Sequence, residues 1–388
     1  MSSSPTRGRA SWMTDELALF RDTVREFFRR ESVPHYERWS AQQSVDRDFW
    51  RKAGEVGLLC AGIPTDYGGG GGTFAHEAIA LEEQARAGDT AFGNAIHSSI
   101  VAWYLLNYAT EDQKHRWLPR MATGELVAAI AMTEPGTGSD LQAIKTRARR
   151  CGDEYVVDGA KTFISNGKNC DIVVLVCKTG DTAGGREAIS LIVVETNDEL
   201  KGFSRGRLLN KIGQHGQDTA ELFFDGVRVP VDNLLGPEEG RGFIQLMHQL
   251  PQERLVIATV AAAVMETTVE HTIAYTKQRK AFGQDLLSFQ NTRFKLAECK
   301  TEAAIARVFV DECIDRHLRG ELDTETASMA KWWTTKKQCE VVDECLQLHG
   351  GYGYMVEYPV ARAYIDSRIQ MIAGGTNEIM KEIIGRAL

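Results

Sequence analysis

The hydrophobic spacing of this chain changes twice, and these changes constrain the fold more than any other feature of the sequence. Up to about residue 125 apolar residues recur every three or four positions, as in TDELALFRDTVREFFRRE, which predicts helices with one buried face. The next segment contains short β-branched runs such as EYVVDG and CDIVVLVC, which predict the strands of a compact antiparallel barrel or sandwich. Beyond residue 238 helical spacing returns over long stretches with few prolines. We therefore expect an α+β fold that is mostly α. Its predicted parts are a disordered tail (1–13), an N-terminal helical domain (14–125), a middle β-barrel or sandwich domain (126–238) and a C-terminal helical-bundle domain (239–388).

Composition and charge exclude several classes of function. The chain has 388 residues, of which 43% are hydrophobic, so it can bury substantial cores. A net charge of −8 without a long run of Lys or Arg argues against nucleic acid and against a membrane surface as partners. The longest uncharged run, 90–110, is interrupted by Asn, His and Ser, so we expect a buried helix there and no membrane span. The start MSSSPTRGRAS lacks the apolar segment of a secretory signal.

Cysteine placement indicates the compartment. The eight cysteines are scattered, with no CxxC pair and no paired histidine spacing. This pattern favours a reducing compartment and gives no indication of a disulfide framework or of a bound metal.

Two glycine-containing segments allow more than one interpretation. The stretch AMTEPGTGSD is a Pro-Gly turn followed by small and hydroxyl residues, whose backbone N–H groups could meet a polar ring or a phosphate. It does not match GxGxxG, and the chain contains no Walker A motif, so a simple turn remains an alternative. The five glycines at 68–72 could form a flexible loop tip or could face a ligand.

A series of motifs gives the strongest indication of function. After AMTEPGTGSD come KTFISNG, KQRKAFG, QLHGGYGY and GGTNEIM, and in this order they resemble the acyl-CoA dehydrogenase family along nearly all of the chain. Through LPQERLVIA and GGTNEIMKE the chain is most similar to the long-chain and isovaleryl-CoA dehydrogenase branch. The resemblance implies a flavoprotein of fatty acid metabolism that uses FAD to oxidise a medium-chain, long-chain or branched acyl-CoA to the trans-2-enoyl-CoA. It also implies electron transfer to an electron-transfer flavoprotein, a homotetramer, and a cytoplasmic location in a bacterium or, alternatively, the mitochondrial matrix.

The resemblance assigns cofactor-binding roles to residues in several motifs. Around the flavin ring it places Met132, Thr133, Phe163 and Ser165, whose alternative role is strand packing. Ser139 matches a position near cofactor and the pantetheine of the substrate, and it could equally cap the turn that follows. Toward the rest of the flavin, held mainly by a neighbouring subunit, the resemblance assigns Arg279, Gln290, Gln347, Gly350 and Gly351. It also assigns cofactor binding to Phe282, Thr376 and Glu378.

The catalytic base presents a departure from the usual family pattern. Most relatives carry a glutamate immediately before the Gly-Thr of the C-terminal motif, where this chain has Gly374. The long-chain and isovaleryl branch carries its carboxylate within a PQER or LER stretch, and Glu253 matches that place. The residues Leu250–Glu253 suggest a helix start, where an acidic residue is common without any catalytic role. We expect Glu253 to be the general base and Arg254, Gly374 and Gly375 to contact substrate, with Gly374 leaving room for Glu253.

Two other functions are compatible with the same motifs. An acyl-CoA oxidase of the same fold would pass electrons to oxygen, although such chains are usually longer and carry an additional C-terminal domain. A non-catalytic flavin-binding subunit of a hetero-oligomer is disfavoured because both Glu253 and Arg279 are present.

Overall fold

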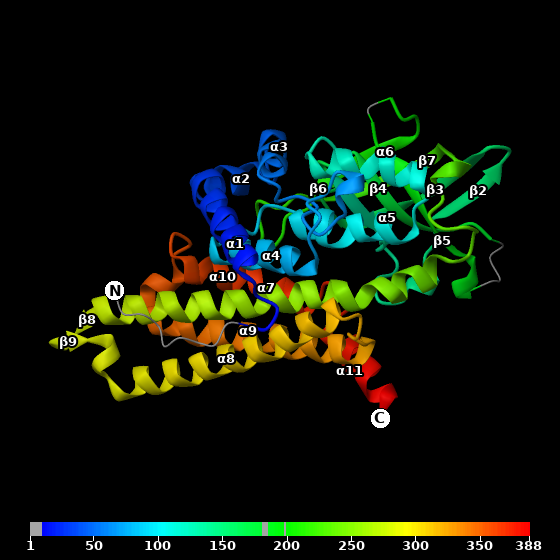
Figure 1. The fold of residues 1–388 in the computed structure, drawn as a ribbon. Helices are drawn as coiled ribbons and strands as arrows, with labels where there is room; N and C mark the ends of the chain where they lie inside the picture. The colour runs from blue at the N-terminus through cyan, green and yellow to red at the C-terminus, as the bar shows by residue number, and fades with distance from the viewer. Residues whose placement is uncertain (1–9, 181–184, 198) are drawn as a thin grey trace.

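The structure, a computed structural model, describes residues 10–180, 185–197 and 199–388. Helices form its two ends in the sequence, and a curled sheet forms the middle (Figure 1). This is the predicted mostly helical α+β fold. The boundaries of the three domains stay predictions, whereas the layers they form are clear in the ribbon.

The N-terminal region consists of helices, three of which, α1, α4 and α6, begin after a threonine whose side chain caps the first turn. Thr73 caps one of them by accepting a hydrogen bond from Ala75 N at 3.3 Å, and the Nδ1 of His76 accepts one from Thr73 N at 3.1 Å. The helices are α1 (Asp15–Phe27), the π-helix η1 (Phe28–Ser32), α2 (Tyr36–Gln42), α3 (Arg47–Glu55), α4 (Phe74–Arg86), the π-helix η4 (Ala95–Val101), α5 (Ala102–Tyr108) and α6 (Glu111–Ala122).

The structure describes part of the segment predicted as a disordered tail, residues 10–13. Residues 1–9 lie outside the described residues, but Trp12 is only 6% exposed and belongs to a core cluster shared with α4 and the C-terminal helices. Burial of the large indole side chain of Trp12 stabilises the position of this segment. The chain is therefore held against the core before α1 begins. The predicted buried helix within 90–110 starts at Ala95, as η4, and continues as α5.

The middle region is one seven-stranded sheet in the order β1-β4-β2-β3-β7-β6, with β5 paired to β4. The two quoted β-branched runs, EYVVDG and CDIVVLVC, form parts of β3 and β4. The pairs β2–β3, β3–β7, β6–β7 and β4–β5 are antiparallel. β1 pairs with β4 in parallel, so the expectation of a purely antiparallel arrangement is wrong. A long crossover between β1 and β4 permits this direction. The strands are β1 (Ala128–Ala131), β2 (Arg147–Cys151), β3 (Glu154–Ser165), β4 (Ile172–Lys178), β5 (Ile189–Glu195), β6 (Phe203–Leu208) and β7 (Thr219–Pro230).

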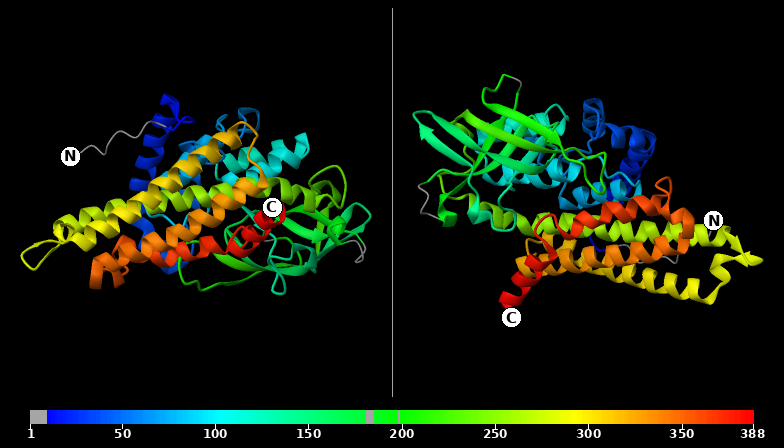
Figure 2. Two further views of the ribbon diagram at one scale, coloured as in Figure 1. Left: turned by 90° about the horizontal axis from the view of Figure 1, so that it is seen from below. Right: turned by 180° about the vertical axis from the view of Figure 1, so that it is seen from behind.

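The C-terminal region is a bundle of long helices. In Figures 1 and 2, α7 lies between the N-terminal helices and sheet on one side and α8 and α9 on the other. The elements are α7 (Gly242–Gln278), the hairpin β8 (Lys280–Ala281) and β9 (Gln284–Asp285), α8 (Gln290–Leu318), α9 (Thr324–His349), η9 (Gly350–Tyr354), α10 (Pro359–Ser367), η10 (Arg368–Met371) and α11 (Asn377–Ala387).

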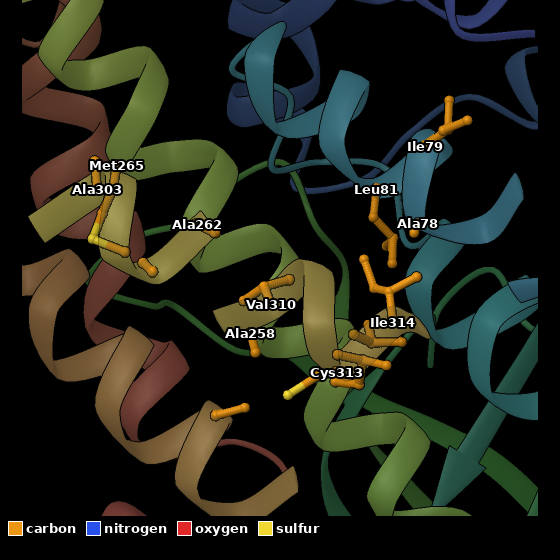
Figure 3. Close-up of a cluster of buried hydrophobic side chains, with 14 of the residues drawn as sticks. Ala78, Ile79, Leu81, Ala258, Ala262, Met265, Ala303, Val310, Cys313 and Ile314 are labelled. Atoms are coloured by element: carbon orange, nitrogen blue, oxygen red, sulfur yellow. The ribbon is translucent and has the colours of Figure 1, made fainter. Parts of the chain in front are cut away.

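The core that joins these layers is built from small and aliphatic side chains. Figure 3 shows Leu81 of α4, Ala258 of α7 and Val310 of α8 converging in one cluster. Alanines on α7 allow its neighbours to approach closely, which fixes the position of the helix between two layers. By length and composition alone α7 could also cross a membrane, but 56% of its most apolar window is buried in the structure, as is common for core helices.

Candidate active site

Glu253 lies in the interior of α7 and is almost fully buried. The predicted helix start at Leu250–Glu253 is wrong, because α7 begins at Gly242 and accommodates Pro251 internally. Glu253 is 6% exposed, and its Oε1 accepts a hydrogen bond from the Tyr104 hydroxyl at 2.7 Å. Burial raises the pKa of Glu253 to about 7, although the Tyr104 hydrogen bond and the charge of Arg254 act in the opposite direction. A carboxylate with a pKa near neutrality is suited to proton transfer as a general base.

Arg254 brings a buried positive charge next to this carboxylate. It is 3% exposed, and its Nη1 donates to the Ser328 hydroxyl on α9 at 3.1 Å. Its Nε finds no hydrogen-bond partner among the described residues. Burial lowers the pKa of Arg254, while the charge of Glu253 opposes that effect. A guanidinium with a free N–H in a buried position can meet a polar atom of a ligand.

The Gly374–Gly375 turn lies against the same face of α7 as Glu253. Both glycines have positive φ, +65° and +92°, so side chains there would be strained. A Cβ placed on Gly374 would approach the Cδ1 of Ile257 to 2.6 Å, and no atom of Glu253 lies within 4 Å of it. Since Ile257 follows Glu253 by one helical turn, the loop and the carboxylate share one face of α7. A Cβ on Gly374 would therefore meet Ile257 first, and the expectation that Gly374 leaves room for Glu253 stays a prediction.

The residues predicted around the flavin ring come together where the end of β3 meets the loop after β1. Thr162 N donates to Thr133 O at 2.9 Å, which places the segment after β1 beside the end of β3. Below them the fully buried Lys161 donates to Met132 O at 2.8 Å and to Glu134 at 2.9 Å. Ser165 ends β3, and the exposed Ser139 lies on the same loop as Met132.

Phe163 combines a strained backbone with an exposed aromatic ring. Its φ is +59°, at a register irregularity between Lys161 and Ile164, and it is 67% exposed. A left-handed conformation costs a non-glycine residue about 1–2 kcal/mol. Strain of this kind combined with an exposed aromatic ring is typical of a binding site.

Most of the other predicted cofactor residues lie elsewhere, toward the far end of α7. Arg279 ends that helix, and its guanidinium lies 5.4 Å from the ring centroid of Tyr352 in η9. This contact brings Arg279 next to Gly350 and Gly351, where an added Cβ would meet open space. Phe282 is 96% exposed at the tip of the β8–β9 hairpin. Two other predicted cofactor residues are exposed. Gln290 lies at the start of α8, shortly after Phe282, and Gln347 lies near the end of α9, shortly before Gly350.

The two clusters lie toward opposite ends of the long helix α7. Glu253 and Arg279 are separated along α7 by about 39 Å at 1.5 Å per residue. Figure 1 shows the β8–β9 hairpin at the opposite end of the bundle from the sheet, and Figure 2 shows the same. Thr376 and Glu378 lie at the other end, where Thr376 caps α11 by accepting from Ile379 N at 3.3 Å.

Several contributors were not identified from the sequence. Tyr104 contacts Glu253 although the two residues are 149 positions apart in the chain. In the sequence only the apolar run around Tyr104 indicated that its side chain is buried. Another hydrogen bond joins α7 to η4, because Gln252 Nε2 donates to Ser99 O at 2.7 Å. Gln252 and His317 also line a cleft of about 510 Å³ between α5, α7 and the end of α8. Gly72 lines this cleft as well.

Comparison with known proteins identifies the family. Three family models match, described as the N-terminal (residues 14–125), middle (129–227) and C-terminal (240–388) domains of acyl-CoA dehydrogenase. The chain belongs to the acyl-CoA dehydrogenase family. It is 48% identical over 376 residues to the mitochondrial long-chain specific acyl-CoA dehydrogenase of Mus musculus, covering 97% of this chain and 87% of the relative. Membership confirms the predicted resemblance and identifies the chain as an oxidoreductase of a flavoprotein family in fatty acid metabolism.

Solved structures of acyl-CoA dehydrogenases share the complete fold. An acyl-CoA dehydrogenase from Geobacillus kaustophilus superposes with a TM-score of 0.95 at 47% identity, covering 98% of this chain and 99% of that one. A glutaryl-CoA dehydrogenase from Mycobacterium smegmatis in complex with FADH2 superposes with a TM-score of 0.89 at 26% identity, covering 97% and 95%. The acyl-CoA dehydrogenase family depends on FAD, and the exposed, strained Phe163 and the open glycines of η9 fit such a ligand. Among the described residues no group of three or more His, Cys, Asp or Glu side chains could hold a metal ion.

Proposed function

We propose that the protein dehydrogenates a medium-chain, long-chain or branched acyl-CoA to the trans-2-enoyl-CoA and transfers the electrons to an electron-transfer flavoprotein. The observation that carries this proposal is the buried Glu253 carboxyl, held by Tyr104 on the face of α7 that also meets the Gly374–Gly375 turn. A glycine at 374 leaves Glu253 as the carboxylate of this face.

In the proposed reaction Glu253 removes the proton from the carbon α to the thioester. Tyr104 fixes the orientation of the carboxylate, and the apolar surroundings keep its pKa near 7, so the base is ionised over a useful fraction at neutral pH. The backbone N–H of Gly374 would donate to the thioester oxygen, where negative charge develops. The positive charge of Arg254 would stabilise this negative charge. When bound, FAD supplies the acceptor for the hydride that leaves the β carbon.

Two sets of residues would hold the cofactor. Met132, Thr133, Phe163 and Ser165 would contact the flavin ring, and Ser139 would lie near the pantetheine. Because Arg279 lies about 39 Å from Glu253 along α7, we propose that the Arg279 cluster contacts the flavin of another copy, together with Gln290 and Gln347. This arrangement supports a homo-oligomer, for which a homotetramer is our proposal, located in the bacterial cytoplasm or alternatively in the mitochondrial matrix.

A screen of acyl-CoA esters tests the proposal. Purified protein with bound flavin is mixed with short, medium, long and branched esters and an artificial electron acceptor, under argon and in air. We expect turnover with the acceptor under argon, and Glu253→Gln serves as the matched control. Turnover that needs only oxygen and yields peroxide would identify an oxidase, and a yellow protein without turnover on any ester would favour the non-catalytic alternative.

A further inference from the structure

A buried lysine contacts the turn next to the proposed base. Lys331 of α9 is 0% exposed, and its Nζ donates to Gly375 O at 2.6 Å and to Asn377 Oδ1 at 3.1 Å. Both acceptors are neutral oxygen atoms. Burial of an ammonium group without a carboxylate partner costs free energy that packing alone would avoid with a methionine. Its position therefore calls for a reason beyond stability.

The two hydrogen bonds from Lys331 hold the Gly374–Gly375 turn, which has no side chains of its own to stabilise its conformation. Gly374 and Gly375 have no side chains, and both adopt positive φ, so their conformation depends on contacts from outside the turn. Asn377 is itself held, since Thr335 Oγ1 lies 3.1 Å from its Nδ2. Lys331 thus links α9 to the carbonyl of the turn and to the first residue of α11.

The same lysine adds to a concentration of positive charge. Ser328, which accepts a hydrogen bond from Arg254, precedes Lys331 by one turn of α9, so the two buried cations face the same region. The charged groups that face Lys331 are Arg254 from α7 and Glu378 from α11. Glu378 is exposed, whereas Arg254 and Lys331 are buried, so the net local charge in the interior is positive.

We propose that Lys331 is a positioning residue of the dehydrogenation reaction, which holds the Gly374–Gly375 turn toward the thioester oxygen and adds positive charge where negative charge develops. This inference rests on the proposed function. Donors and charges that are oriented before the reaction stabilise an oxyanion without reorganisation during the reaction. This positioning role of Lys331 differs from the role of Glu253, which removes the proton from the α carbon.

Protonation of Lys331 gives the proposal a pH signature. Burial, followed by the charge of Arg254, lowers the pKa of Lys331 to about 8, while Glu378 opposes the shift. Glu253 must be ionised, so kcat/KM should rise with pH through about 7. It should then fall through about 8 as the ammonium loses its charge.

The test compares Lys331→Met with Lys337→Met, the same change at a more exposed position of α9. In the holoenzyme we expect Lys331→Met to lower kcat about 10-fold to 100-fold with little change in KM, and to remove the fall of kcat/KM above pH 8. Lys337→Met should match the parent. The second readout is the infrared stretching frequency of a ¹³C-labelled thioester carbonyl in bound enoyl-CoA, which should move toward its solution value in Lys331→Met only.

The outcomes separate this inference from the proposed function. If Lys331→Met does not fold, Lys331→Gln, which retains a donor but no charge, takes its place with the same expectations for the pH profile. Parent-like kcat and carbonyl frequency in a folded variant, or an alkaline fall shared by parent and variant, would overturn the role of Lys331. Failure of the parent enzyme to oxidise any ester would instead overturn the proposed function.

Discussion

Replacement of Glu253 by glutamine should change turnover and stability in opposite directions. The amide is nearly isosteric with the carboxylate, and its Oε1 can still accept the hydrogen bond that Tyr104 donates at 2.7 Å. The side chain should therefore stay in place. Without a base to remove the α proton, turnover should fall by about 10²-fold to 10⁴-fold.

The magnitude of the stability change follows from burial. In the folded protein the pKa of Glu253 is raised from 4.5 to about 7, so the folded state holds its proton to higher pH than the unfolded state does. The protonated Glu253 carboxyl therefore makes a contribution to the free energy of unfolding that is fully present below pH 4.5 and is lost as the pH rises through 7. Above pH 8 this loss approaches about 3 kcal/mol, at 1.36 kcal/mol for each pH unit of difference. Glutamine does not ionise, so the variant should be more stable than the parent at pH 8.5 and similar to it near pH 4.5.

Two assays check these expectations on the same preparations. Steady-state turnover with an artificial acceptor gives the catalytic loss, and denaturant midpoints at pH 5 and pH 8.5 give the stability difference. The flavin spectrum should be unchanged, which controls for a disturbed fold. Near-normal turnover would refute Glu253 as the base, and a stability difference that does not grow with pH would refute the argument from burial.

Three further variants test other parts of the site. Arg279→Ala should weaken flavin retention by about 1.5–3 kcal/mol, since a pyrophosphate would lose a charge-assisted partner, whereas Arg316→Ala should not; equal flavin content after dialysis would remove Arg279 from the site. From the family resemblance we expect the buried Ser98 and Ser99 to lie near the closed end of the acyl pocket, so leucine at either position should shift preference toward shorter esters. An unchanged ratio of long-chain to short-chain turnover in folded variants would contradict that placement. Gly374→Ala should lower the melting temperature and turnover, because φ is +65° and the new Cβ would lie 2.6 Å from Ile257 Cδ1. Ile257→Val in the same chain should recover part of both, and no recovery would mean that backbone strain dominates.

Some features of the site could be predicted from local patterns, and others could not. Phe163 and Arg279 were recognised within motifs, because short stretches of sequence carry the identity of such residues. The left-handed backbone of Phe163 arises from its register with β7, which no local pattern reveals. Pro251 suggested a helix start, yet packing on both sides of α7 carries the helix through it.

The sequence by itself determined the order of helical and strand regions and the family, because hydrophobic periods of 3.6 and 2 residues and ordered motifs are local properties of the chain. Only the tertiary structure decided which distant residues meet. Tyr104 reaches Glu253, the turn at Gly374 lies against Ile257, and Lys331 holds Gly375 because α5, α7, α9 and the C-terminal loop pack together. The same packing buries Glu253 and so raises its pKa, since desolvation depends on neighbours that are remote in sequence.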